Sequence, residues 1–145
     1  MVTVERSALV NFSAQVLYDL VADIHSYPEF LPWCSAAEAD LSEPGFIAAT
    51  LHVSYHGIRQ NFSTRNVNQP GRQIEMNLLS GPFRHLKGTW RFDALAPHAS
   101  KVSLHLEYQL SSGLLERMVG SVFDHIANTF VDAFVHRAES LHGEK

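Results

Sequence analysis

The chain has 145 residues, of which 46% are hydrophobic and 18% charged, and these values are typical of one ordinary globular domain. Its single cysteine, Cys34, excludes an internal disulfide and a cysteine-based zinc site. The net charge is −4, and no apolar run approaches the roughly 20 residues that a helix needs to span a bilayer.

The N-terminal part of the chain predicts a strand, short helices and an aromatic segment. Residues 2–10 are typical of a strand. Ser13 is a suitable N-cap for a short helix that ends near Ala22. In residues 27–34 (Tyr-Pro-Glu-Phe-Leu-Pro-Trp-Cys), two prolines limit any helix to about one turn. The large apolar side chains of this segment predict either a plug in the core or the rim of an apolar cavity.

From about Ala36 to Leu110 the pattern is one strand after another. Apolar and polar residues alternate, for example over 73–78 and 102–110, and such alternation predicts an antiparallel sheet with one face in water. Proline and glycine turn signals recur about every 12 residues, which indicates a meander of hairpins with about six strands.

The last predicted element is a long amphipathic helix over residues 114–141. At about 1.5 Å per residue it is roughly 40 Å long. Its apolar residues come in pairs that recur every four positions, from Leu114/Leu115 to Phe134/Val135. Each step of four residues rotates the apolar stripe by about 40°, so a curved sheet covers this helix better than a flat one. The alternative is an ordinary core helix with irregular partners.

Charge is unevenly distributed along the chain. Residues 1–45 have a net charge of −6, residues 46–92 a net charge of +5, and residues 93–145 a net charge of −3. One interpretation is a basic band on the middle strands that meets phosphate, on RNA or on anionic lipid. The other is that this band pairs with the acidic segments within the fold.

No catalytic or metal-binding pattern stands out. Cys34 follows Trp33 in an apolar segment, where a free cysteine is usually inert packing. His52 and His56 are about 13 Å apart on a predicted strand, too far to share one metal ion, and they fall on its polar face. Glycine-rich phosphate loops and paired carboxylates are absent from the sequence. We therefore expect a protein that is not an enzyme and binds no metal.

Three separated motifs resemble one family. They are the segment 27–34, Thr64-Arg65-Asn66, and Gly81-Pro82-Phe83 followed by 86–92 (Leu-Lys-Gly-Thr-Trp-Arg-Phe). These motifs are similar to the START-like polyketide cyclase/dehydrase superfamily. Within it they resemble the branch of coenzyme Q-binding proteins and the bacterial ribosome-association toxin A. The likeness runs in register over nearly the whole chain.

The resemblance implies an α+β helix-grip fold in a single domain over residues 1–145. In this fold a curved antiparallel sheet of about seven strands wraps around the long C-terminal helix, and two short helices follow the first strand. An apolar cavity lies between sheet and helix. Family likeness favours the early turns of the helix as its wall, whereas the sequence itself leaves open whether early or late turns line it.

The resemblance also implies two functions. The first is non-enzymatic carriage of a hydrophobic ligand, most simply an isoprenoid quinone such as ubiquinone, in support of respiration; this lipid is a ligand and not a cofactor. The alternative is a toxin that binds the large ribosomal subunit and blocks subunit joining. The expected partners are a hydrophobic small molecule, the large ribosomal subunit and transiently a membrane surface, but not DNA. The N-terminus lacks signal and transit patterns, so we expect a bacterial cytoplasmic protein, free or peripheral to the inner membrane.

Two groups of residues are candidates for these contacts. The apolar cavity is expected to be lined by Phe30, Leu31, Trp33, Phe83, Trp90, Val119 and Phe123. Contacts to a ligand head group or to a partner are expected from Arg59, Arg65, Asn66 and Lys87.

Overall fold

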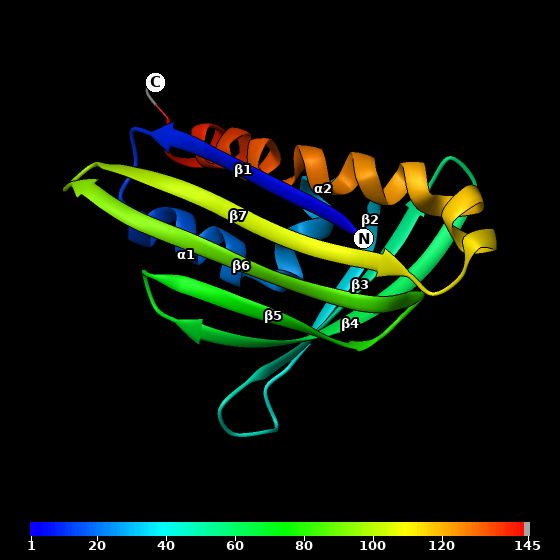
Figure 1. Ribbon diagram of the computed structural model, residues 1–145. Helices are drawn as coiled ribbons and strands as arrows, with labels where there is room; N and C mark the ends of the chain where they lie inside the picture. Colours follow the sequence, from blue (N-terminus) through cyan, green and yellow to red (C-terminus); the bar gives the residue numbers. More distant parts are fainter. Residues whose placement is uncertain (144–145) are drawn as a thin grey trace.

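The computed structural model describes residues 1–143 and consists of one curved sheet wrapped around a long helix (Figure 1). The strands are β1 (Val2–Val10), β2 (Cys34–Asp40), β3 (Ile47–Tyr55), β4 (Ile58–Gln69), β5 (Gln73–Ser80), β6 (Phe83–Ala96) and β7 (Ala99–Leu110). The helices are α1 (Ala14–Ala22), the short 3-10 helix η1 (Ile24–Glu29) and α2 (Gly113–His142). The predicted helix-grip architecture, with its seven strands and two short helices after the first strand, is confirmed.

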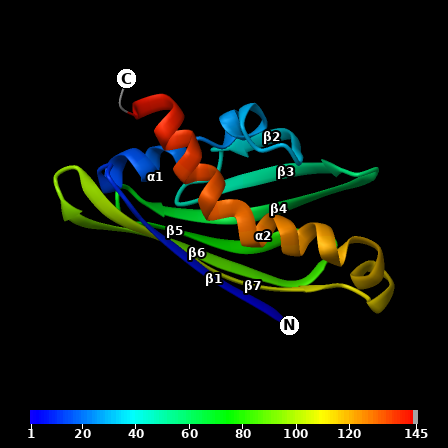
Figure 2. The same ribbon diagram turned by 90° about the horizontal axis from the view of Figure 1, so that it is seen from above.

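The sheet has the strand order β1-β7-β6-β5-β4-β3-β2, and every neighbouring pair is antiparallel. From β1 at one edge, α1 and η1 carry the chain to the opposite edge, and β2 to β7 return as a meander. The last strand of the meander therefore pairs with the first strand of the chain. This arrangement lets α2, which follows β7, turn back across the concave side of the sheet (Figure 2).

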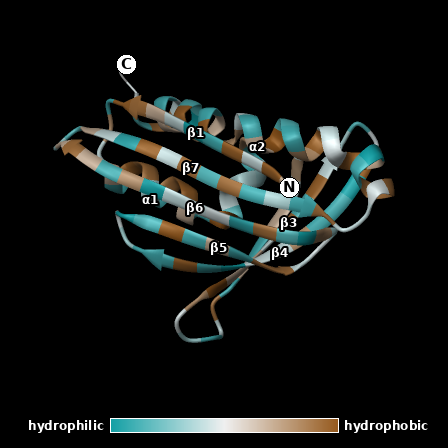
Figure 3. Ribbon diagram, viewed as in Figure 1, coloured by the Kyte–Doolittle hydropathy of each residue, from teal (hydrophilic) through white to brown (hydrophobic). Residues whose placement is uncertain are grey.

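Side chains alternate between the two faces of the sheet, as the sequence predicts, and hydropathy alternates along the strands in Figure 3. On β7, Val102 and Leu104 face inward and are 0% and 1% exposed. Their neighbours Lys101 and Ser103 are on the outer face. The concave face is thus the apolar wall of the core, and the convex face meets water.

The connection between β1 and β2 forms as its capping and proline signals indicate. The Ser13 hydroxyl accepts a hydrogen bond from the backbone N–H of Val16 at 3.2 Å and caps α1. η1 begins at Ile24, three residues before the segment predicted to hold a single turn, and includes Pro28. Its 3-10 geometry and the second proline, Pro32, end the helical stretch before β2.

The beginning of α2 differs from the prediction. Leu114 and Met118 belong to the predicted apolar stripe, but they are 64% and 59% exposed. All the fully buried residues of α2 lie between Val119 and Ala138. In the first two turns of the helix the stripe is therefore covered only in part, at Leu115. Over residues 1–143, no helix is both long and apolar enough to cross a membrane.

An aromatic cluster fills the core under the second half of α2. Phe134 is fully buried, and its ring centroid lies 5.2 to 5.4 Å from those of Tyr27, Phe30, Phe130 and Trp90. These distances and the tilted ring planes are those of favourable aromatic pairs. The segment 27–34 therefore acts as a core plug at this end of the fold.

Candidate functional site: an apolar cavity and a basic sheet face

A cavity of about 70 Å³ lies between the concave face of the sheet and the middle of α2. Its wall is almost entirely apolar. The sheet contributes among others Leu51, Phe62, Met76, Phe83 and Leu104, the region around η1 contributes Ile24, Tyr27 and Trp33, and α2 contributes Phe123, Ile126, Ala127 and Phe130. The cavity that the family resemblance implies is thus present, although it is small.

Three of the seven residues predicted to line the cavity do so. Trp33, Phe83 and Phe123 are in its wall. The structure places the other four away from it, as follows: Leu31, Trp90 and Val119 are buried in the surrounding core, and Phe30 is partly exposed beside Arg137. A ligand-binding role for Trp33, Phe83 and Phe123 stays a prediction.

The middle turns of α2 line the cavity. Phe123, at the end of the early turns that family likeness favours, is joined in the wall by Ile126, Ala127 and Phe130. The later residue Phe134 packs tightly against the aromatic cluster instead. The sequence signal for Ile126 and Ala127 was their place in the repeating apolar pairs, but that signal does not distinguish cavity wall from filled core.

The size of the cavity limits what it can hold. Ligand pockets usually have volumes of roughly 300–1,000 Å³, and one water molecule occupies about 30 Å³. A cavity of about 70 Å³ is therefore too small for a long isoprenoid tail with the side chains in these positions. A ring-sized ligand would need some of the lining side chains to move.

Two polar side chains, Thr64 and Asn66 on β4, also belong to the wall. They are 6% and 5% exposed, and the Thr64 hydroxyl donates a hydrogen bond to Oδ1 of Asn66 at 2.6 Å. Arg65, between them, points to the opposite face and lies 4.6 Å from the centre of the Phe46 ring. Of the four predicted polar contacts, Asn66 alone reaches the cavity. Thr64 was missed, although its inward position in the strand alternation was readable from the sequence.

The two tyrosines in the cavity wall have hydroxyl groups that are already engaged. The Tyr27 hydroxyl donates to the carbonyl oxygen of Val21 at 2.5 Å, and the Tyr108 hydroxyl donates to Oδ1 of Asp124. Burial is the main reason why the pKa values of both hydroxyls are raised above the ordinary value. At neutral pH both tyrosines are therefore neutral donors committed to protein acceptors.

Cys34 lies beside this region, and its environment does not activate it. Burial is the main cause that raises the pKa of its thiol to about 11. The thiol donates a weak hydrogen bond to the carbonyl oxygen of Ala36 at 3.4 Å. Because the thiolate is the nucleophilic form, a thiol that stays protonated at neutral pH is poorly suited to covalent catalysis.

The convex side of the sheet carries exposed basic side chains, which we call the basic face: Arg59 and Arg65 on β4, Lys87 and Arg91 on β6, and Lys101 on β7. Within residues 1–143, none of these five forms an ion pair. In the part of the chain that the structure describes, there are therefore no ion pairs between these five basic side chains and the acidic segments. Arg59, Arg65 and Lys87 cannot reach a ligand in the cavity because they lie on the opposite side of the sheet.

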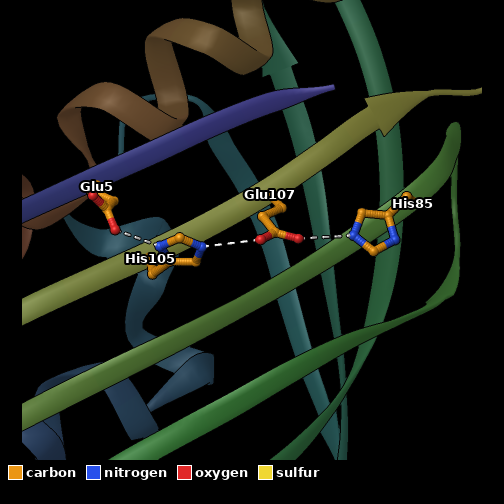
Figure 4. Close-up of polar contacts among 4 residues, drawn as sticks. All are labelled: Glu5, His85, His105 and Glu107. Carbon is orange, nitrogen blue, oxygen red and sulfur yellow. Dashed lines mark hydrogen bonds and ion pairs between the residues drawn. The ribbon is translucent and has the colours of Figure 1, made fainter.

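Two histidines and two glutamates form a chain across β1, β7 and β6 on the same convex side (Figure 4). The links are Glu5 to His105 at 2.9 Å, His105 to Glu107 at 3.2 Å, and Glu107 to His85 at 3.4 Å. The four side chains form a linear row and do not converge on one point, as the ligands of a metal ion would. Indeed, the described part of the chain contains no cluster of three or more such side chains that would hold a metal ion.

This chain should make stability depend on pH. Hydrogen bonds with Glu107 and then with Glu5 raise the pKa of His105 above 6.5, and hydrogen bonds with His105 and then His85 lower the pKa of Glu107 below 4.5. The contribution of His105 to the free energy of unfolding is complete at pH values below the pKa of this histidine in the unfolded chain. It is lost as pH rises through the raised pKa of His105 in the folded protein. The contribution of Glu107 is present above its unfolded pKa and is lost as pH falls through its folded pKa. Both contributions are therefore present together between about pH 4.5 and 6.5.

We expect the free energy of unfolding to decrease slightly as pH rises from 6 to 8, and to decrease less in His105→Gln. The effect is small because the groups are exposed and screened by solvent. Urea unfolding at several pH values measures it. His98→Gln, an exposed histidine in the turn between β6 and β7, serves as the control. Equal pH slopes for wild type and His105→Gln would show that the chain contributes nothing.

Comparison with known proteins gives one family and several relatives. Residues 10–135 match the family described as polyketide cyclase / dehydrase and lipid transport. The ribosome association toxin RatA of Pseudomonas aeruginosa is 45% identical, and the alignment covers 97% of each chain. The mitochondrial coenzyme Q-binding protein COQ10 homolog B of Xenopus laevis is 25% identical, over 97% of this chain and 59% of its own.

Among solved structures, the Zhui aromatase/cyclase from Streptomyces sp. R1128 superposes with a TM-score of 0.80 at 21% identity. The superposition covers 95% of this chain and 93% of the other. At this level of identity the likeness shows the fold alone.

Proposed function

Because the chain belongs to the polyketide cyclase / dehydrase and lipid transport family, we propose that it is a ribosome-association protein of the RatA type. In this proposal it acts in the bacterial cytoplasm, binds the large ribosomal subunit and hinders subunit joining. The observation that carries the proposal is the 45% identity over 97% of both chains with a protein named for ribosome association. Ribosome association, the alternative function in the sequence analysis, is therefore better supported than quinone carriage.

The basic face supplies a physical basis for contact with ribosomal RNA. Its five basic side chains are exposed, lie on β4, β6 and β7 of the same sheet, and lack ion-pair partners within residues 1–143. Exposed basic side chains that form no ion pair attract phosphate and release its condensed counterions on binding. The five side chains carry +5 whereas the whole chain carries −4, so binding should depend on this face and not on overall charge.

Co-sedimentation with purified large ribosomal subunits tests the proposal. We expect binding at low salt that weakens steeply as salt rises, because each phosphate contact adds to the slope of affinity against salt. Small subunits, sedimented under the same conditions, are the control for non-specific RNA binding. Failure to sediment with large subunits at low salt, or equal binding to both subunits, would contradict the proposal.

Binding of an apolar ligand is a second candidate function, favoured by the apolar cavity with buried Asn66 in its wall. Its other support is the relative named as a coenzyme Q-binding protein, which is only 25% identical and matches over 59% of its length. Organic extraction of purified protein followed by mass spectrometry tests this candidate. A lipid or quinone in stoichiometric amount supports it, and the absence of any extracted compound together with no uptake of added quinone contradicts it.

Catalysis is not part of the proposal. The aromatase/cyclase neighbour shares the fold but only 21% of the aligned residues. The most nucleophilic side chain near the cavity, Cys34, stays protonated at neutral pH. Turnover of an aromatic polyketide precursor by the purified protein would overturn this part of the proposal.

A further inference from the structure

The inner face of β4 breaks the pattern of the sheet. Along its inward positions, Phe62 is followed by Thr64, Asn66 and Asn68, whereas the inward positions of β6 and of β7 beyond Ser100 carry mostly apolar or aromatic side chains. Thr64 and Asn66 are more than nine-tenths buried, and burying a polar group without full hydrogen bonding is costly. Positions where a sequence departs from such a local rule are the ones where function is expected.

The hydrogen bond between Thr64 and Asn66 leaves the side-chain N–H groups of Asn66 free. Oδ1 of Asn66 accepts from the Thr64 hydroxyl, and Nδ2 of Asn66 has no acceptor among residues 1–143. The hydroxyls of Tyr27 and Tyr108 in the wall are engaged by Val21 and Asp124, and the indole N–H of Trp33 is a further donor there. The side-chain amide of Asn66 is therefore the donor that the polar row on β4 offers to a guest molecule.

Asn68 extends the same polar row along β4. Its Oδ1 is buried and has no hydrogen-bond partner among the described residues. Buried amide oxygens in folded proteins nearly always have a partner, so an orphaned one needs an explanation. The row thus holds two unused hydrogen-bonding groups, one donor on Asn66 and one acceptor on Asn68, on the same face of one strand.

We propose that Asn66, positioned by Thr64, donates a hydrogen bond to a carbonyl oxygen of a neutral, ring-sized apolar ligand in this cavity. This inference rests on the ligand-binding candidate above and adds the chemistry of recognition. The cavity wall contains no charged side chain. An ionised carboxylate would have to be buried there without a counter-ion, so the site selects neutral carbonyl compounds over fatty acids.

The neighbour of Asn66 is a side chain that can make room for a ligand. Met76 on β5 lies directly opposite Asn66 in the strand register and is in the cavity wall. Methionine is unbranched and changes rotamer easily, so it yields space more readily than the aromatic residues of the wall. An engineered cavity of about 150 Å³ admits benzene, so the present volume of about 70 Å³ must roughly double for a ring to bind.

Two probes with the same methyl-substituted six-membered ring test the role of the carbonyl group. Duroquinone, a fully methylated benzoquinone, carries carbonyl oxygens, and durene is the matching methylated benzene without them. Binding is followed by quenching of tryptophan fluorescence or by calorimetry, and the side-chain amide signals of Asn66 are followed by nitrogen–proton correlation NMR. We expect about tenfold tighter binding of duroquinone and a shift of the Asn66 amide signals with duroquinone only.

Variants on the same strand separate recognition from folding. Asn66→Asp replaces the donor by an acceptor of the same shape, and Asn66→Leu replaces it by an apolar group that carries no buried charge. Both should lose the preference for duroquinone over durene. Asn61→Asp makes the same chemical change on the outer face of β4 and should keep the preference.

The outcomes distinguish this inference from the candidate function on which it rests. If neither probe binds the wild-type protein, both the ligand-binding candidate and this inference are overturned. If both probes bind equally, or if Asn66→Leu keeps the preference, the cavity binds ligands but Asn66 is not the recognition group. If the Asn66 amide signals stay unchanged while duroquinone binds, this inference is likewise overturned.

Discussion

Replacing Arg65 and Lys87 together by glutamate should weaken binding to large ribosomal subunits by about 100-fold at low salt. The two side chains lie in one row across β4, β5 and β6, because Arg65 pairs with Asn77 and Asn77 pairs with Lys87. Both are exposed at the centre of the basic face. Loss of two charged contacts, each contributing about 1.5 kcal/mol, gives an effect of this size.

The salt dependence of binding gives a second measure of the same change. Each basic residue that contacts phosphate adds about one to the slope of log affinity against log salt. The slope should therefore be smaller by about two in the double variant than in the wild type. Sedimentation at a series of salt concentrations measures it.

A control with the same change in net charge makes this experiment specific. Arg72→Glu with Arg117→Glu alters the β4–β5 turn and the start of α2, both exposed and away from the centre of the basic face. This control should bind nearly as well as the wild type. If the control variant and the variant of the basic face lose the same affinity, overall charge and not the basic face controls binding. If the variant with Arg65 and Lys87 replaced binds large subunits with wild-type affinity, the basic face does not contact the ribosome.

The sequence predicts the fold because its signals are local. Alternation with period two places Val102 and Leu104 on one face of β7, and Ser13 marks the start of α1. These patterns depend on backbone geometry that repeats from residue to residue. The meander of hairpins and the long helix follow from them together with the resemblance to a family, whereas the pairing of β1 with β7 is seen only in the structure.

The cavity was predictable only in part because it depends on packing between distant elements. Trp90 and Val119 are as apolar and as buried as Phe123, yet only Phe123 reaches the open space. Periodicity tells which residues face inward, but whether a side chain fills the core or borders a void depends on the side chains opposite. For the same reason the sequence could not show that Leu114 lies beyond the part of α2 that the sheet covers.

The charge distribution is another feature that the sequence leaves open. The basic band of residues 46–92 was readable from the sequence, but its partners were not. In the structure Arg137 pairs with Glu29 at 2.7 Å, whereas Arg65 faces water and the Phe46 ring. The Arg137–Glu29 pair joins residues that are distant in sequence, so its presence follows from the tertiary structure and not from local composition.

Phe134→Ala should lower the free energy of unfolding by about 3–5 kcal/mol, because large-to-small changes in a filled core leave a void. Phe134 is fully buried and its ring contacts the rings of Tyr27, Phe30, Phe130 and Trp90. Domains of this size are stable by only about 5–15 kcal/mol, so the variant should unfold at much lower urea concentration. Urea unfolding followed by tryptophan fluorescence measures the change.

Phe46→Ala provides the matched control, since Phe46 is partly exposed and its ring contacts the guanidinium of Arg65. We expect this change to lower the free energy of unfolding by less than about 1 kcal/mol. A similar loss for both variants would mean that the aromatic cluster around Phe134 is not a tightly packed core. Because Phe134 is not in the cavity wall, the folded fraction of Phe134→Ala should still bind duroquinone with the wild-type preference. The second half of α2 would then contribute mainly to the stability of the fold, and its middle turns would contact the ligand.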